Sequence, residues 1–208
     1  MTVAEYDDDF FLENGYWVAP CTNLDALEEL QNKVVKLINE KVPDASNFSL
    51  SDVHNAVKKS DVNFLRMAVF SELNSDQNFR HNYFSLGKNY IEYLCGTELA
   101  ANTKVNFSIQ LPGDETSILP SHCDTFSGES SYQINLWVPL TNCFGDNSMH
   151  IFSPAATDKI IADMEGLEQQ GLGSLFDTYI EGRDYVKLVV NFGQVVLFTP
   201  TVLHGNNL

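Results

Sequence analysis

The sequence predicts an α+β fold with a mainly β core: an antiparallel double-stranded β-helix, or jelly roll, braced by N-terminal helices. Two observations favour this class. Apolar residues recur at helical spacing up to about residue 95, whereas from about residue 104 they alternate with polar residues in short runs separated by turns. Helices followed by a series of short strands are typical of an α+β domain.

The size and composition of the chain fit one domain. It has 208 residues, of which 44% are hydrophobic and 12% aromatic, enough for a sizeable core. We expect a single domain over 1–208. Within it we expect a helical part over about 1–100, a jelly-roll core over about 101–208 and a helical insertion over about 154–181.

Two long helices are predicted in the N-terminal part. Thr22 or Asn23 can cap the first of them, because both side chains accept hydrogen bonds from backbone N–H groups. Its apolar residues at helical spacing are Leu24, Leu27, Leu30, Val34, Leu37 and Ile38. The second helix is predicted from about residue 75 to residue 95, where Gly96 is a suitable stop.

The first predicted strand covers 105–111 and has one polar face. That face consists of Asn106, Ser108 and Gln110. Two arrangements fit this pattern: the polar side chains line an interior cavity, or they meet water on a half-exposed strand. A turn at 112–114 follows, because proline, glycine and aspartate occur there in succession.

Further strands are predicted over 132–140 and 148–152. Towards the end of the chain, 186–192 and 195–198 flank Gly193-Gln194 and predict a β-hairpin. Between these strands, the 154–181 insertion is compatible with a lid or with a dimer contact, so a homodimer is an open expectation.

Charge and cysteine content exclude several classes of partner. The net charge is −16 and the pI is near 4.4, so we expect binding to neither nucleic acid nor an anionic membrane. No apolar run is long enough to span a bilayer, and the first residues lack the features of a signal peptide. The four cysteines form no C-x-x-C pair, which favours a reduced, cytoplasmic protein.

The stretch His122-Cys123-Asp124, together with the distant His204, predicts a metal site. Two imidazoles and one carboxylate are the ligands of the facial triad that holds non-heme Fe(II) with open positions. In a strand, residues i and i+2 point to the same face, so His122 and Asp124 can reach one metal while Cys123 faces away.

Other polar residues near this motif are candidates for ligand contacts. Thr125, Ser127 and Glu129 form a polar loop that suits a hydroxyl-rich ligand such as a sugar, or is an ordinary solvated loop. Arg66 is a rare cation among apolar residues. A buried arginine needs a partner, so it pairs with an acidic side chain or binds an anionic group of the substrate.

Seven blocks of sequence extend the motif over nearly the whole chain: 11–16, 106–114, 119–130, 136–140, 148–151, 193–198 and 203–206. The block at 119–130 reads LPSHCDTFSGES. Together the blocks resemble the 2-oxoglutarate/Fe(II) oxygenases of sporadic carbohydrate biosynthesis clusters, a branch of the phytanoyl-CoA hydroxylase-like superfamily.

The resemblance implies an enzyme. It implies His122, Asp124 and His204 as Fe(II) ligands, 2-oxoglutarate as cosubstrate and O2 as oxidant, with succinate as the coproduct. We expect Gln110, Ser108, Trp137 and Asn206 near 2-oxoglutarate; the resemblance implies this role for Trp137, which is also suited to the core, whereas Gln110 and Ser108 come from the polar face of the predicted strand. The small-molecule substrate is then a sugar, a nucleotide-sugar or a similar polar metabolite, contacted by Asn106, Arg66, Thr125, Ser127 and Glu129.

One departure from the family pattern keeps an alternative open. Family members grip the far carboxylate of 2-oxoglutarate with an arginine about a dozen residues beyond the distal histidine, whereas this chain ends at Leu208. We expect a further C-terminal strand that carries this arginine. The alternative is a non-catalytic metal-binding jelly roll, a sensor or a degenerate relative; a cupin-type enzyme without cosubstrate fits less well because such sites carry more histidines.

Overall fold

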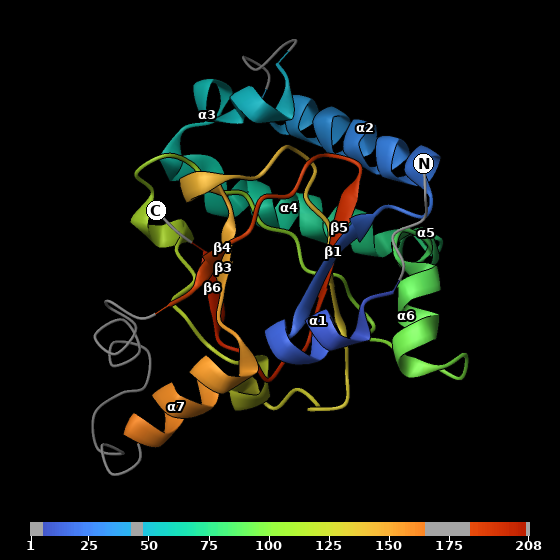
Figure 1. The fold of residues 1–208 in the computed structure, drawn as a ribbon. Coiled ribbons are helices and arrows are strands. Elements are labelled where there is room, and N and C mark those ends of the chain that lie inside the picture. Colours follow the sequence, from blue (N-terminus) through green and yellow to red (C-terminus); the bar gives the residue numbers. More distant parts are fainter. Residues whose placement is uncertain (1–5, 43–47, 165–183, 207–208) are drawn as a thin grey trace.

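The computed structural model describes residues 6–42, 48–164 and 184–206, and these form a mixed α/β fold (Figure 1). The helices are α1 (Asp8–Asn14), α2 (Leu24–Lys41), α3 (Val53–Ala56), α4 (Val62–Ser75), α5 (Phe79–Ser85), α6 (Lys88–Cys95) and α7 (Pro154–Met164). The strands are β1 (Tyr16–Pro20), β2 (Asn135–Trp137), β3 (Met149–Ile151), β4 (Val186–Lys187), β5 (Gln194–Phe198) and β6 (His204–Asn206). None of the helices in the described ranges is both long and apolar enough to cross a bilayer.

The strands form two antiparallel sheets, with strand orders β1-β5-β2 and β4-β3-β6. Tyr16, Val196 and Phe198 of the first sheet share one core cluster with Met149 and Ile151 of the second. The inner faces of the two sheets therefore pack against each other. The predicted combination of N-terminal helices with short antiparallel strands is confirmed at this level.

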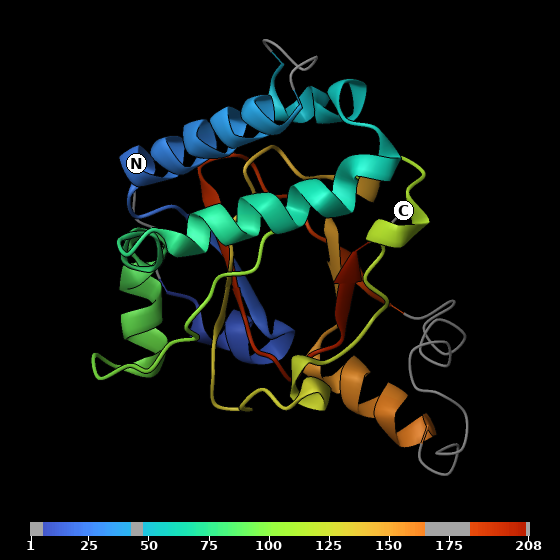
Figure 2. The same ribbon diagram turned by 180° about the vertical axis from the view of Figure 1, so that it is seen from behind.

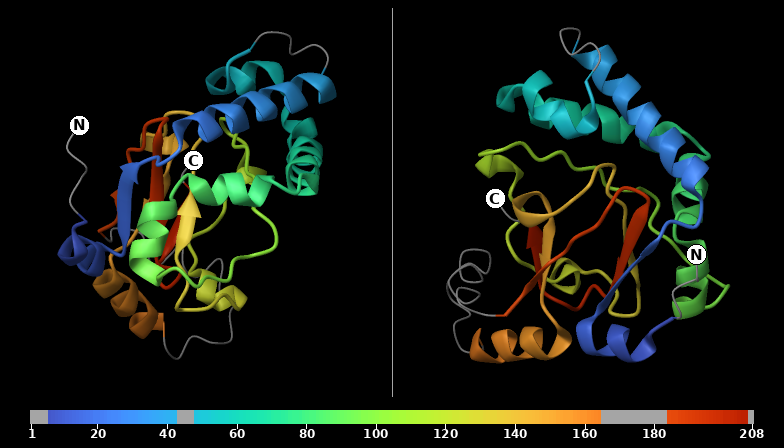
Figure 3. Two further views of the ribbon diagram at one scale, coloured as in Figure 1. Left: turned by 90° about the vertical axis from the view of Figure 1, so that its right-hand side faces the viewer. Right: turned by 45° about the horizontal axis from the view of Figure 1, so that its top comes forward.

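Helices cover the outer face of the first sheet. Val195 and Leu197 point away from the second sheet and pack with Leu27 of α2 and Tyr90 of α6. Because β5 is buried on both faces, its sequence is an uninterrupted apolar run and not an alternating one. Figure 2 shows α2 and α4 crossing one end of the strands, and Figure 3 shows α1 and α7 together at the opposite end.

The N-terminal helix predictions hold in part. The side chain of Asn23 caps α2 by accepting a hydrogen bond from the backbone N–H of Ala26, as predicted. The single helix predicted over 75–95 is wrong, because the chain breaks between α5 and α6. At the break, a Cβ on Gly87 would lie 2.8 Å from Cδ1 of Leu136, so glycine allows the close approach of the helix to β2. The predicted stop at Gly96 is confirmed by its φ of 82°.

The prediction of a strand over 105–111 is also wrong, although the apolar and polar side chains of this segment lie on different sides as predicted. Its apolar residues pack against the core of α2 and α4. Its backbone groups are bonded by side chains of α4 instead of a neighbouring strand. Asn74 both donates to the carbonyl of Val105 and accepts from its N–H, each at 2.9 Å. Arg66 Nε donates to the carbonyl of Ile109 at 2.9 Å.

The predicted C-terminal hairpin is wrong as well. β4 pairs with β3, and β5 pairs with β1 and β2, so the two segments lie in different sheets. Cys143 and Val190 form an isolated antiparallel bridge that directs the chain after β4 towards the 143 region. The strands predicted over 132–140 and 148–152 correspond to the shorter β2 and β3. The predicted insertion begins with α7, and its remainder, 165–181, lies outside the described residues.

Candidate metal centre

The structure brings together the three residues that the sequence singled out as metal ligands. His122 Nε2 lies 3.3 Å from Asp124 Oδ1, and His204 Nε2 lies 3.6 Å from Asp124 Oδ2. One nitrogen or oxygen atom from each residue lies within 4.8 Å of the other two. Two imidazoles and a carboxylate at this separation can hold one divalent cation and leave coordination positions open.

Backbone pairing places the two histidines side by side. The N–H of His122 donates to the carbonyl of His204 at 2.9 Å, and the N–H of His204 donates back at 3.0 Å. Asp124 departs from the strand geometry expected of it, because it begins a short 3-10 helix, Asp124–Ser127. Cys123 faces away as predicted: it is 1% exposed, and burial raises the pKa of its thiol to about 12.

Both imidazoles are oriented by a carbonyl two residues earlier in the chain. His122 Nδ1 lies 2.8 Å from the Pro120 oxygen, and His204 Nδ1 lies 3.0 Å from the Val202 oxygen. A carbonyl oxygen only accepts, so in each neutral imidazole the proton is on Nδ1 and the lone pair on Nε2; only the protonated form of His122 can also donate from Nε2 to Asp124. Such outer contacts fix the tautomer that a metal requires.

Asp124 is held by residues that the sequence reasoning missed. Asn135 Nδ2 donates to Asp124 Oδ2 at 2.5 Å, and Gln133 Nε2 donates to Asn135 Oδ1 at 3.0 Å. Burial alone would raise the pKa of Asp124, but the hydrogen bond with His122, the nearby His204 and the Asn135 amide outweigh it and lower that pKa. A period-two pattern over 133–137, shared with Trp137, was the available signal for these two amides.

The triad opens onto a cleft of about 1860 Å³ between the sheets and the helices. Among the predicted ligand-contacting residues, those that line it are Asn106, Ser108, Gln110, Glu129, Trp137 and Asn206. Thr125 and Ser127, on the short helix after Asp124, are not among its lining residues, and neither is Arg66.

Arg66 and Asn206 are both engaged within the protein. Besides its bond to Ile109, the Arg66 guanidinium donates to Ser117 Oγ and lies 3.6 Å from Asp114 Oδ2. Of the two roles open to Arg66, the structure shows the acidic pairing. Asn206 accepts from the N–H of Leu119 and donates to the carbonyl of Ser117, which joins β6 to the 117–119 segment.

Gly205 is required by the packing beside His204. A Cβ at this position would lie 2.9 Å from the carbonyl oxygen of Leu119 and 2.9 Å from Cε1 of His150. The ring of His150 is itself fixed, because Nε2 lies 2.6 Å from the hydroxyl of Ser121. Glycine therefore allows β6 to fit between these groups and carry His204 to the site.

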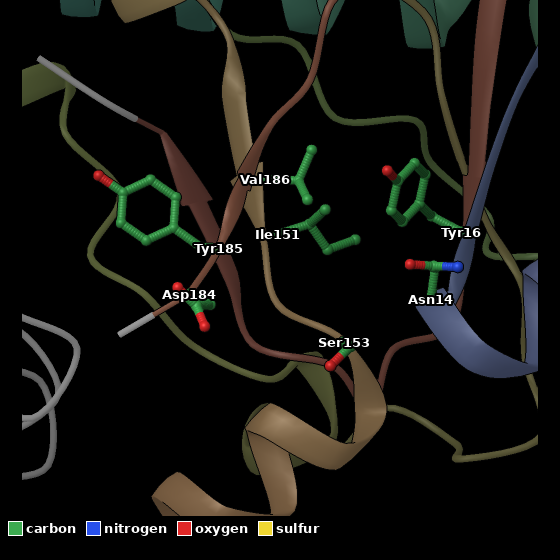
Figure 4. A pocket seen from close by; sticks show the side chains of 7 residues that line it. All are labelled: Asn14, Tyr16, Ile151, Ser153, Asp184, Tyr185 and Val186. Carbon is green, nitrogen blue, oxygen red and sulfur yellow. The ribbon is translucent and has the colours of Figure 1, made fainter. Parts of the chain in front are cut away.

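A second, smaller cavity of about 160 Å³ shares no lining residue with the cleft (Figure 4). It is lined by Asn14, Tyr16, Ile151, Ser153, Asp184, Tyr185 and Val186. This set contains one carboxylate and neither histidine nor cysteine, so it does not resemble a metal-ligand set.

Comparisons with known proteins assign no family to this chain. No protein-family model and no curated protein matches the chain. Several solved structures match the chain, and one of them is a distant neighbour. It is the crystal structure of an N-substituted L-amino acid dioxygenase from Burkholderia ambifaria AMMD, at 15% identity and a TM-score of 0.34, covering 93% of this chain and 77% of that one. The chemistry of this chain therefore has to be judged from its own site.

The two histidines should make any metal binding at the triad sensitive to pH. The hydrogen bond to Asp124 raises the pKa of His122, whereas burial lowers the pKa of His204. A histidine binds metal only when it is neutral. Because the pKa of His122 is raised above its usual value of 6.5, protons begin to compete with the metal for His122 at a pH above 6.5. We expect Mn(II) affinity, measured by calorimetry, to fall between pH 8 and pH 6, approaching about tenfold per pH unit below the raised pKa. An affinity that stays constant over this range would contradict the assignment of His122 as a ligand.

Proposed function

We propose that the protein is an Fe(II)- and 2-oxoglutarate-dependent oxygenase that hydroxylates a small polar metabolite. One observation carries the proposal. The Nε2 atoms of His122 and His204 and a carboxylate oxygen of Asp124 converge at the wall of a cleft large enough for a cosubstrate and a substrate. Two facing antiparallel sheets with helices outside them also suit a jelly-roll scaffold.

The donor set fits iron better than a structural zinc site. Structural zinc is closed by four ligands, often thiolates, whereas this site offers three ligands and the nearest thiol, Cys123, faces away and stays protonated. When bound, iron supplies the activation of O2 while 2-oxoglutarate is decarboxylated to succinate. The protein supplies orientation: His122 and His204 present fixed nitrogen lone pairs, and Asp124 presents an ionised carboxylate.

The proposed substrate is a sugar, a nucleotide-sugar or a similar hydroxyl-rich compound. Neutral polar side chains that can bind hydroxyl groups line the cleft, among them Asn106, Ser108 and Gln110. Trp137 lies on the same face as Asn135 and offers a flat apolar surface for either ligand. The cysteines in the described residues are free, which suits the cytoplasmic location that we also propose.

One observation favours a non-catalytic metal-binding protein as the second candidate. The distal carboxylate of 2-oxoglutarate needs a cation. Within the part of the chain that the structure describes, Arg66 is paired with Asp114, and the two cations that line the cleft, Arg80 and Lys104, are both exposed and not enclosed beside the triad. A metal-binding protein without a cosubstrate would need no such cation.

Anaerobic titration of the full chain with Fe(II) and then 2-oxoglutarate tests the proposal. The enzyme should bind one Fe(II), develop a visible charge-transfer band when 2-oxoglutarate is added, and form succinate once O2 is admitted. Fe(II) binding without the band or succinate would support the second candidate. Absence of Fe(II) binding would rule out both.

A further inference from the structure

Two amide side chains, Gln133 and Asn135, connect the interior face of the first sheet to the metal-binding carboxylate. We infer that they form an amide relay that positions Asp124 as a one-oxygen ligand and so sets the affinity of the centre for its metal. The inference rests on the proposed metal-dependent function. It assigns a positioning role to two residues outside the ligand set.

The relay can run in one direction only. An ionised carboxylate accepts hydrogen bonds and donates none, so the Nδ2 of Asn135 must face Asp124 Oδ2. The Oδ1 of Asn135 then faces the other way, where Gln133 Nε2 donates to it at 3.0 Å. Gln133 therefore fixes which end of the Asn135 amide points at the ligand.

The strand β2, which carries Asn135, is held in place by contacts on both of its faces. Asn135 pairs with Phe198 in the ladder between β2 and β5. The next residue, Leu136, packs on the opposite face with Leu86 and Tyr90. Its carbonyl accepts a hydrogen bond from the Tyr83 hydroxyl at 2.9 Å. Contacts on the sheet side and on the helix side therefore fix the backbone that carries the amide, which is what a ligand-positioning residue requires.

The relay gives the two carboxylate oxygens of Asp124 different roles. Asn135 occupies one lone pair of Asp124 Oδ2, which also lies 3.6 Å from His204 Nε2, whereas Oδ1, 3.3 Å from His122 Nε2, is not held by the amide and is the oxygen that we assign to the metal. The two histidines are oriented by backbone carbonyls, which no side-chain substitution removes. Asn135 is the contact at the triad whose orienting effect a single substitution can test. Loss of such an outer contact weakens metal binding by about 10- to 100-fold.

The experiment is Mn(II) titration of the full chain and of three variants. Asn135→Ala removes the donor and should weaken binding by about 10- to 100-fold. Gln133→Glu replaces a donor by an acceptor, so the Asn135 amide should turn its oxygen towards Asp124; we expect a loss of at least tenfold, about the lower bound of that range. Asn63→Ala, an exposed amide on α4, is the matched control and should bind like the wild type.

A second readout needs no metal. In the metal-free protein, the side-chain NH2 resonances of Asn135 should be shifted by the short bond to Asp124, and Gln133→Glu should move them. Denaturant unfolding of each variant shows whether it is folded. If Asn135→Ala does not fold, Gln133→Glu still tests the relay, because Gln133 bonds to Asn135 and not to a metal-binding residue.

The outcomes separate this inference from the proposed function. Wild-type Mn(II) affinity in both Asn135→Ala and Gln133→Glu overturns the relay and leaves the proposed function standing. Wild-type protein that binds neither Mn(II) nor Fe(II) overturns the proposed function. In that case, unchanged Asn135 resonances in Gln133→Glu overturn the relay as a structural unit too, whereas shifted ones retain it.

Discussion

Replacing Asp124 with alanine should abolish metal binding and the succinate-forming reaction. The substitution removes the one anionic ligand of three, and the two imidazoles that remain are neutral when they bind metal. Removal of an outer-shell partner already costs about 10- to 100-fold in affinity, so loss of a ligand should exceed about 100-fold. His204→Ala should have a similar effect. Mn(II) calorimetry and succinate formation with added Fe(II) measure the result.

Asp158→Ala is the matched control for Asp124→Ala. Asp158 is an exposed carboxylate on α7, outside the ligand set. Its removal should leave both metal affinity and succinate formation within about twofold of the wild type, since exposed substitutions away from sites have small effects. If Asp124→Ala keeps the metal affinity of Asp158→Ala, the assigned centre is wrong.

Replacing Arg66 with methionine should produce the largest loss of stability among the substitutions considered. The Arg66 side chain is 17% exposed and that of Asp114 is 4% exposed, so their ion pair is largely shielded from water. Breaking such a pair leaves a buried charge without its cation and costs about 3 kcal/mol or more. For a chain of this size that corresponds to a fall in Tm of about 6–12 °C. Urea unfolding of the metal-free protein measures the change.

Two further variants complete this test. Arg80→Met, on the exposed face of α5, should change the free energy of unfolding by no more than about 0.5 kcal/mol. The double variant Arg66→Met/Asp114→Leu should regain part of the stability, because apolar replacement of both partners removes the buried charge. If Arg66→Met is as stable as Arg80→Met but raises the KM for substrate, the guanidinium binds a ligand instead.

The three residues that could hold a metal ion were accessible from the sequence, but their local structure was not. The i, i+2 spacing correctly predicted that the side chain of Cys123 faces away from those of His122 and Asp124. The strand geometry on which this prediction was based holds only in part, because Asp124 begins a 3-10 helix and does not lie in a strand. The spacing limits which side chains can reach one metal ion. The backbone conformation at His122 depends in addition on its pairing with the distant His204.

Strand pairing was the least predictable part of the fold. The alternation over 105–111 identified its buried face, yet Asn74 and Arg66 of α4 take the place of a neighbouring strand. The two segments around Gly193 looked like a hairpin because they are close in sequence, but they belong to different sheets. Hydrogen-bond partners in a sheet come from distant segments, so local pattern does not name them.

The types of side chain at the site and the buried faces of the elements around it could be predicted from the sequence. The ligand types, the cap at Asn23 and the apolar stripe of α2 follow from side-chain chemistry and from backbone periodicity, both of which are local. The pairing of His204 with His122 and the contact of the Asn135 amide with Asp124 became visible only in the folded chain. These contacts join segments far apart in the chain, and they form only when the core fixes where those segments meet.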